Sequence, residues 1–189
     1  MRIGQKPVSD TTNTDLSAWF SEHLKSSAEE FIWAVEQVPA ERRTMAPPSS
    51  RLGEWSVVRH VFHLLTYEEY IALPAIRVWL DDPFPSIDHL DEDALWQEHT
   101  LNLQQMLEKF REGRAAQIEL LTNLPDSAWE EKREALWGPV TLRWALTKTF
   151  QHTAEHIHDV LRLVLFWDRA LQRMQEEEQS SSQGQEEQA

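Results

Sequence analysis

Residues 141–167 read TLRWALTKTFQHTAEHIHDVLRLVLFW, and apolar side chains recur in this stretch every three or four positions. That spacing puts them on one face of an α-helix. Thr141 is a suitable N-cap, so we predict a helix from there to about Arg173. On a helical projection His152 and His156 lie about 40° apart, inside the apolar face. Two imidazoles therefore interrupt the surface that should face a protein core.

Apolar periodicity and capping residues predict three more helices upstream. The second of them contains Pro74, and a proline inside a helix kinks or splits it. Only five glycines occur in 189 residues, which argues against a sheet-rich fold. We therefore predict an all-α four-helix bundle. The expected helices run from Thr14 or Asp15 to Pro39, from Ser56 to about Leu80, from Asp91 to Leu124, and from Thr141 to about Arg173.

Several segments are expected to lie outside the helices. Residues 1–13 are polar and should be loose, residues 81–90 connect two helices, and residues 129–140 have no regular pattern. The last segment, residues 174–189, is rich in Glu, Gln and Ser, and we expect a disordered acidic tail. The domain organisation predicted is a bundle over residues 12–173 followed by that tail.

The composition excludes several classes of function. The net charge is −14, and no Lys/Arg cluster stands out along the chain. The composition therefore argues against nucleic acids and anionic membrane surfaces as partners, because both attract clustered positive charge. No apolar run reaches membrane-spanning length. With no cysteine in the chain, disulfides and thiolate ligands are absent. No signal peptide is visible, so we expect a cytoplasmic protein.

The histidines raise the question of a metal site. His152 and His156 lie one helical turn apart, a spacing that lets two imidazoles reach one ion. Hydrogen bonds to side chains or water would satisfy buried imidazoles equally well. His158 points about 200° away and should lie on the surface. His63, on the second helix, belongs to a polar stripe that faces either solvent or a polar pocket, and periodicity does not decide between them. The other members of that stripe are Ser56, Arg59, His60, Tyr67 and Tyr70.

Two motifs carry a resemblance to a known family. Residues 55–64 read WSVVRHVFHL, and residues 152–156 read HTAEH. Both are similar to motifs of the DinB/YfiT-like superfamily, and the resemblance covers roughly residues 12–172. It implies a four-helix bundle in which His63, His152 and His156 hold one divalent ion, commonly zinc or nickel. Some members are thiol-dependent transferases or isomerases that use mycothiol, bacillithiol or glutathione-type thiols. Homodimers are frequent in the family.

Three neutral histidines would leave a coordination position open, as in catalytic rather than structural zinc sites. The leading hypothesis is transfer of a low-molecular-weight thiol to a small electrophile, or isomerisation through thiol addition. Because the chain has no cysteine, the sulfur must come from a cofactor. This step comes from the family resemblance.

Two other functions remain open. The first is hydrolysis of a small-molecule substrate by a hydroxide held on the ion, with a nearby carboxylate as general base. Asp159 is the candidate carboxylate or ligand-orienting group, and Glu155 lies at the edge of the same face. Arg59 and Tyr67, together with Tyr70, are candidates to bind an anionic substrate group. The second is a non-catalytic metal-binding or dimerisation module, whose tryptophans fill the core and an interface.

Overall fold

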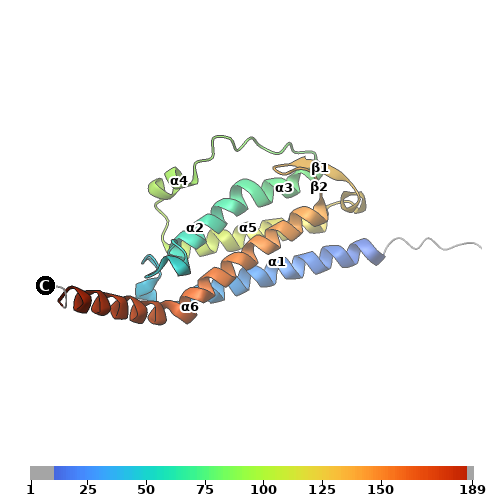
Figure 1. Cartoon of the computed structure of the whole chain (residues 1–189). Helices are drawn as coiled ribbons and strands as arrows, with labels where there is room; N and C mark the ends of the chain where they lie inside the picture. Colours follow the sequence, from blue (N-terminus) through green and yellow to red (C-terminus); the bar gives the residue numbers. More distant parts are fainter. Residues whose placement is uncertain (1–10, 187–189) are drawn as a thin grey trace, which may run out of the picture.

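Four long helical segments lie side by side in the computed structural model, which describes residues 11–186 (Figure 1). They are α1 (Thr11–Gln37), the segment that begins with α2 (Val57–Tyr67), α5 (Leu103–Asn123) and α6 (Leu142–Glu186). The predicted all-α four-helix bundle is confirmed. Helix α1 begins at Thr11, three or four residues earlier than expected, and residues 1–10 of the expected loose N-terminus lie outside the described residues.

The bundle core is built from two apolar clusters with a polar layer between them. One cluster includes Phe31, Leu64 and Phe110, and the other includes Leu24, Leu121 and Leu146. Each of the four segments contributes to both clusters, as amphipathic helices in a bundle do. Between them, buried polar side chains occupy the middle of the bundle. They are Ser27, Thr66, Glu68, Arg114, Gln117, Thr149, Thr153 and His156.

The segment that carries Pro74 changes pitch where the proline occurs. Helix α2 passes into a π-helical turn, η3 (Glu68–Ala72), then into α3 (Leu73–Arg77) and the short 3-10 helix η4 (Val78–Leu80). The Leu73 N–H bonds to the Glu68 carbonyl five residues back. Pro74 follows at the start of α3, where its missing N–H costs least. The interruption expected at Pro74 is therefore a π-turn within one continuous helical segment.

The predicted third helix from Asp91 to Leu124 was wrong, because it is two helices. Asp91 caps only the short α4 (Glu92–Glu98), where its side chain accepts from the Ala94 N–H. A new helix, α5, then begins after Asn102, whose side chain and Gln105 form a reciprocal capping box. This capping box satisfies free N–H groups at the start of a second helix. Helix α4 is separate from α5 and packs against α2 (Figure 1).

A small β-hairpin occupies part of the stretch that we expected to be irregular. Strand β1 (Lys132–Ala135) pairs antiparallel with β2 (Gly138–Thr141), and Ala135 lies opposite Gly138. Gly138 has φ +81°, a conformation that glycine adopts without strain. As predicted, the Thr141 side chain accepts from a backbone N–H at the start of α6, that of Trp144.

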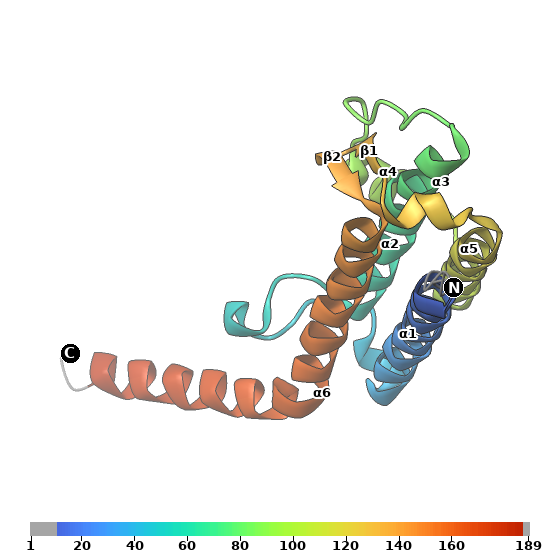
Figure 2. The same ribbon diagram turned by 90° about the vertical axis from the view of Figure 1, so that its right-hand side faces the viewer.

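Helix α6 is longer than expected, and its C-terminal part leaves the bundle (Figure 2). We expected residues 174–189 to be a disordered tail, but residues 174–186 continue the helix. This segment contains no proline, and extending an existing helix needs no new nucleus. Residues 187–189 lie outside the described residues. Within residues 11–186, no helix combines the length and apolarity needed to cross a membrane.

Candidate metal centre

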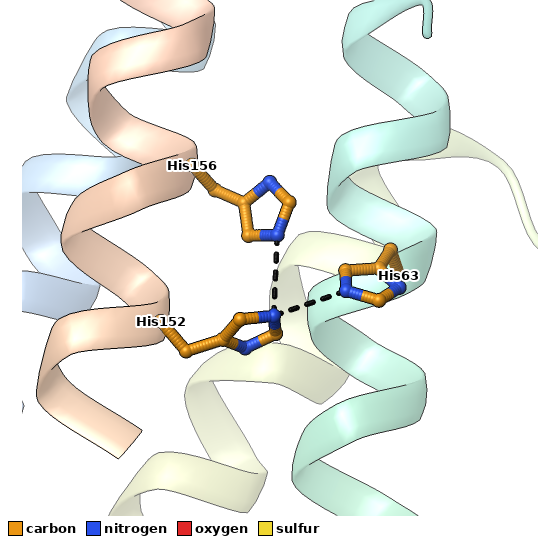
Figure 3. Close-up of side chains that lie close together, drawn as sticks. All are labelled: His63, His152 and His156. Carbon is orange, nitrogen blue, oxygen red and sulfur yellow. Dashed lines mark hydrogen bonds between the residues drawn. The ribbon is translucent and has the colours of Figure 1, made fainter. Parts of the chain in front are cut away.

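Three histidines from two facing helices point their rings at one another (Figure 3). His63 lies on α2, and His152 and His156 lie one turn apart on α6. The Nε2 atoms of His63 and His152 are 3.0 Å apart, and those of His152 and His156 are 3.3 Å apart. The structure therefore brings together the three residues that the family resemblance identified as ligands.

The spacing of these nitrogens suits one shared ion. Imidazole nitrogens bind Zn²⁺ at about 2.0–2.1 Å, so two ligands of a tetrahedral ion lie about 3.3 Å apart. The distances of 3.0 and 3.3 Å match that separation. The three residues also form one of two groups in the described chain whose ligand atoms lie within 4.8 Å of one another. The donor set therefore fits a divalent cation.

Glu92 sets the tautomer of His63. Its Oε2 lies 2.7 Å from His63 Nδ1, and the carboxylate accepts that proton. In its neutral form, His63 then presents the lone pair of Nε2 to the other two histidines. Arg59 holds Glu92 in place, with Nη2 at 3.0 Å from Oε1. Burial raises the pKa of Glu92, but the hydrogen bond from His63 and the charge of Arg59 outweigh it and leave the pKa below its usual value.

His60 plays the same part for His156. The two Nδ1 atoms lie 2.9 Å apart, so one ring must donate and the other accept. If His156 offers its Nε2 lone pair to an ion, its Nδ1 carries the proton and His60 accepts it. Metal-bound histidines usually donate their second N–H in this way. His60 itself is buried against Trp55, whose ring lies 5.4 Å away.

His152 is the exception, because its buried Nδ1 has no hydrogen-bond partner among the described residues. If His152 carries its proton there, three Nε2 lone pairs converge with nothing between them. In either tautomer the buried Nδ1 lacks a partner, which costs free energy, so this atom does not decide between the two forms. A cation among the three Nε2 atoms removes the repulsion between their lone pairs. The convergence of the three Nε2 atoms therefore fits a metal ion.

His60, His152 and His156 are held neutral. Burial, followed by the charges of neighbouring histidines, lowers the pKa of His152 and of His156 to about 3. Burial lowers the pKa of His60 to about 4, with a further contribution from His63. Neutral imidazole is the form that binds metals. At neutral pH the site therefore needs no proton release from these rings before a cation binds.

The open side of the site lies along α6. A hollow of about 600 Å³ is lined by His152, His156, Glu155, Asp159 and neighbouring residues of that helix. The half-buried Trp55 packs against the site, with its ring parallel to that of His156 and the ring centroids 6.1 Å apart. His152 and His156 thus border a hollow on α6, and Trp55 packs against the rings of His63 and His156.

Comparison with known proteins agrees with this geometry. The family model of the DinB superfamily matches residues 23–160. The chain belongs to the DinB superfamily. Among solved structures, it is similar to YfiT from Bacillus subtilis, described as a probable metal-dependent hydrolase with an unusual four-helix bundle topology. The TM-score is 0.65 at 22% identity over 86% of this chain and 94% of YfiT, which shows a shared fold. None of the curated proteins matches.

The candidate substrate-binding and general-base residues of this DinB-superfamily chain lie in different environments. Arg59 is buried and forms ion pairs with Glu92 and Asp93. Tyr67 is buried with its ring 4.1 Å from that of His152, and burial raises its pKa to about 12. Asp159 lies at the opening, as does the exposed His158.

The polar stripe of α2 faces the bundle, because Arg59, His60 and Tyr67 are all buried. Tyr70 departs from the group and lines a separate hollow beside Leu95 and Lys109. Sequence reasoning missed the roles of Glu92 and His60. Glu92 reaches His63 only because α4 lies over α2, and no spacing in the sequence predicts that approach.

Replacing Glu92 by alanine should weaken metal binding by about 10–100-fold, the usual effect of losing a histidine's hydrogen-bonding partner. Glu92→Gln should restore part of the affinity, because its amide oxygen still accepts from His63. Asp93→Ala is the matched control, since Asp93 is an exposed neighbour on the same helix that also contacts Arg59. Competition titration with a chromogenic chelator measures all three. Equal affinities for Glu92→Ala and Asp93→Ala would show that Glu92 does not orient a ligand.

Acid should destabilise the metal-free protein through these histidines. Their pKa values are about 3 to 4 when folded and about 6.5 when unfolded. Between about pH 3 and about pH 6.5 the unfolded chain binds more protons than the folded chain does. The free energy of unfolding is therefore highest above about pH 6.5 and decreases as the pH falls towards about 3. Urea unfolding at several pH values measures this. A His152→Gln/His156→Gln variant should lose less stability on acidification, and an unchanged slope would contradict the prediction.

Proposed function

We propose that this chain is a divalent-metal-dependent enzyme that activates a small nucleophile at a site made by His63, His152 and His156. One observation carries the proposal: three imidazoles converge at ligand spacing, and two of them border an open hollow. Three protein ligands with one free side are typical of catalytic rather than structural zinc sites. Zinc and nickel are the metals we expect, since both accept imidazole ligands.

A bound divalent ion would lower the pKa of a thiol or of water at the open side and stabilise negative charge there. The residues of the chain orient the ligands and control access to the site. Glu92 and His60 fix the orientation of two ligand rings. Trp55 packs against the rings of His63 and His156 and would limit the access of water to them. The opening on α6 leaves one direction from which a substrate reaches the reacting atoms.

The leading reaction is transfer of a low-molecular-weight thiol to a small electrophile, or isomerisation through thiol addition. The chain has no cysteine, so the thiol must enter from outside. The rim of the opening carries Glu155, His158 and Asp159. These polar side chains suit a hydrophilic thiol better than an apolar one.

The second candidate is metal-dependent hydrolysis, and two observations favour it. Asp159 and Glu155 place carboxylates at the opening, where one of them would act as general base towards water. YfiT, which shares the fold, is described as a probable metal-dependent hydrolase. In this reaction Asp159 would accept the proton of the attacking water.

A paired assay separates these functions. The metal-loaded protein, purified without a histidine tag, is incubated with chloro-dinitrobenzene and a panel of glutathione-type and sugar-linked thiols, and separately with ester and amide substrates. Thiol-dependent conjugation that vanishes in His63→Ala supports the transferase. Hydrolysis without thiol that falls in Asp159→Asn supports the hydrolase. Metal binding without either activity would leave a metal-binding module and contradict both reactions.

A further inference from the structure

A second hollow of about 410 Å³ lies between η2 (Ser50–Leu52) and the outer part of α6. The loop that carries η2 projects from the bundle beside the bend of α6 (Figure 2), and the two elements are in contact. Nothing in the proposed metal chemistry uses this hollow. Its lining residues differ in kind from those of the histidine site.

Arginine dominates the lining of this hollow. Arg51 comes from η2, and Arg162, Arg169 and Arg173 come from α6. The only carboxylate in the lining is that of Glu177. The whole chain has 32 acidic and 18 basic residues, so a site with four arginines and one acid has the opposite balance. The linear sequence hides this cluster because Arg51 is more than a hundred residues from the others.

The charges in the hollow are only partly neutralised. Arg162 donates to the backbone carbonyl of Arg51, and its Nη1 is 3.8 Å from Asp159. Among the described residues, the guanidinium groups of Arg51, Arg169 and Arg173 make no hydrogen bond or ion pair that would use up their charge. Grouped cations of this kind raise the local positive potential and attract an anion. Guanidinium groups bind carboxylates and phosphates through paired hydrogen bonds.

The cluster is held by the backbone on both sides. Arg162, Arg169 and Arg173 follow one another at spacings of seven and four residues, so they share a face of α6. The Ser49 side chain accepts from the Arg51 N–H at 3.3 Å and fixes the start of η2. Contact between Arg162 and the Arg51 carbonyl joins the two elements. The four guanidinium groups therefore surround one hollow rather than separate surface positions.

The remaining lining is apolar. Leu52 is buried at the base, and Phe166 and Met174 are 42% and 39% exposed beside it. Exposed large apolar side chains next to clustered charge are typical of sites for ligands with both kinds of surface. Inorganic phosphate alone would leave this apolar surface in water. A purely apolar ligand would leave the arginines without a partner.

We propose that this hollow binds an amphipathic organic anion, with a carboxylate or phosphate group against the arginines and an apolar body against Leu52, Phe166 and Met174. Its volume of about 410 Å³ is within the range of about 300–1,000 Å³ found for small-molecule sites. The site is separate from the histidine cluster and needs no metal. It therefore stands even if the function proposed above is wrong.

Isothermal titration of the full-length protein tests this site. The probes are octanoate and octyl phosphate, which carry both features, together with octanol and inorganic phosphate, which carry one each. Octanoate, octyl phosphate or both should bind once per chain, and octanol and phosphate much more weakly. In Arg169→Gln/Arg173→Gln the affinity should fall by at least about tenfold, because charge-assisted hydrogen bonds are lost. Arg143→Gln is the matched control, an exposed arginine at the other end of α6.

Every other outcome overturns the proposal. Equal binding of octanol would mean an apolar groove without anion recognition. Binding that survives Arg169→Gln/Arg173→Gln, or that disappears in His152→Ala, would place the anion elsewhere. If no probe binds, sedimentation shows whether a second copy fills the hollow with its acidic C-terminal segment, in which case the arginine variants would dissociate a dimer.

Discussion

His152→Ala should abolish stoichiometric metal binding. His152 lies between the other two ligands, with Nε2 at 3.0 Å from His63 and 3.3 Å from His156. Its loss leaves two imidazoles, too few to hold the ion in a tetrahedral site. We expect the metal content to fall from about one ion per chain to a trace. This loss is larger than the weakening of metal affinity, about 10–100-fold, expected when a ligand loses its orienting partner. Elemental analysis of untagged protein after dialysis measures the content.

The same loss is expected for His63→Ala and His156→Ala, and circular dichroism should show that all three variants remain helical. His158→Ala is the control on the same helix, because His158 is exposed and lies outside the three-ligand group. It should bind metal as the parent protein does. Unchanged metal content in His152→Ala would mean that the ligands were wrongly chosen.

Arg114→Met should destabilise the fold by about 3–5 kcal/mol, the usual cost of leaving one member of a buried ion pair alone. Arg114 and Glu68 are each 1% exposed, and their side chains meet at 2.6 Å in the polar layer of the bundle. Arg114 also donates to Thr153, the residue after His152, and Gln117 donates to Glu68. Burial raises the pKa of Glu68, and the Arg114 guanidinium opposes that rise.

Urea unfolding of two further variants isolates this ion pair. Arg111→Met lies on the same helix and breaks only an exposed pair with Glu108, so it should cost less than about 1 kcal/mol. Arg114→Met/Glu68→Met should recover part of the stability lost in Arg114→Met, because no buried charge is left alone. Equal stabilities of Arg114→Met and Arg111→Met would contradict a buried charged network.

The sequence predicted the helices best where one face meets the core. The periodicity around His152 and His156 is strong because α6 packs on the rest of the bundle over this length. The break between α4 and α5 was missed because the Asp91 cap and the following periodicity also suit one long helix. The structure shows that Asn102 and Gln105 form a capping box, and this places the start of a new helix at Leu103.

The ligands were not equally predictable. His152 and His156 follow from helical spacing within an apolar face. His63 came from the family resemblance, because a polar stripe on α2 suits solvent as well as a buried site. The burial of Arg59 and His60 shows that this stripe faces the bundle and not solvent. Glu92 and Arg51 act through contacts between distant segments, and a single sequence does not encode the geometry of such contacts in its periodicity.

X-ray absorption spectroscopy of the zinc- or nickel-loaded, untagged protein tests the metal centre most directly. The structure predicts one ion per chain with three imidazole nitrogens at about 2.0–2.1 Å and at least one light-atom ligand on the open side. The imidazole scattering should disappear in His152→Ala and persist in His158→Ala. A shell of oxygen ligands alone, or the same imidazole count in both variants, would contradict the three-histidine site.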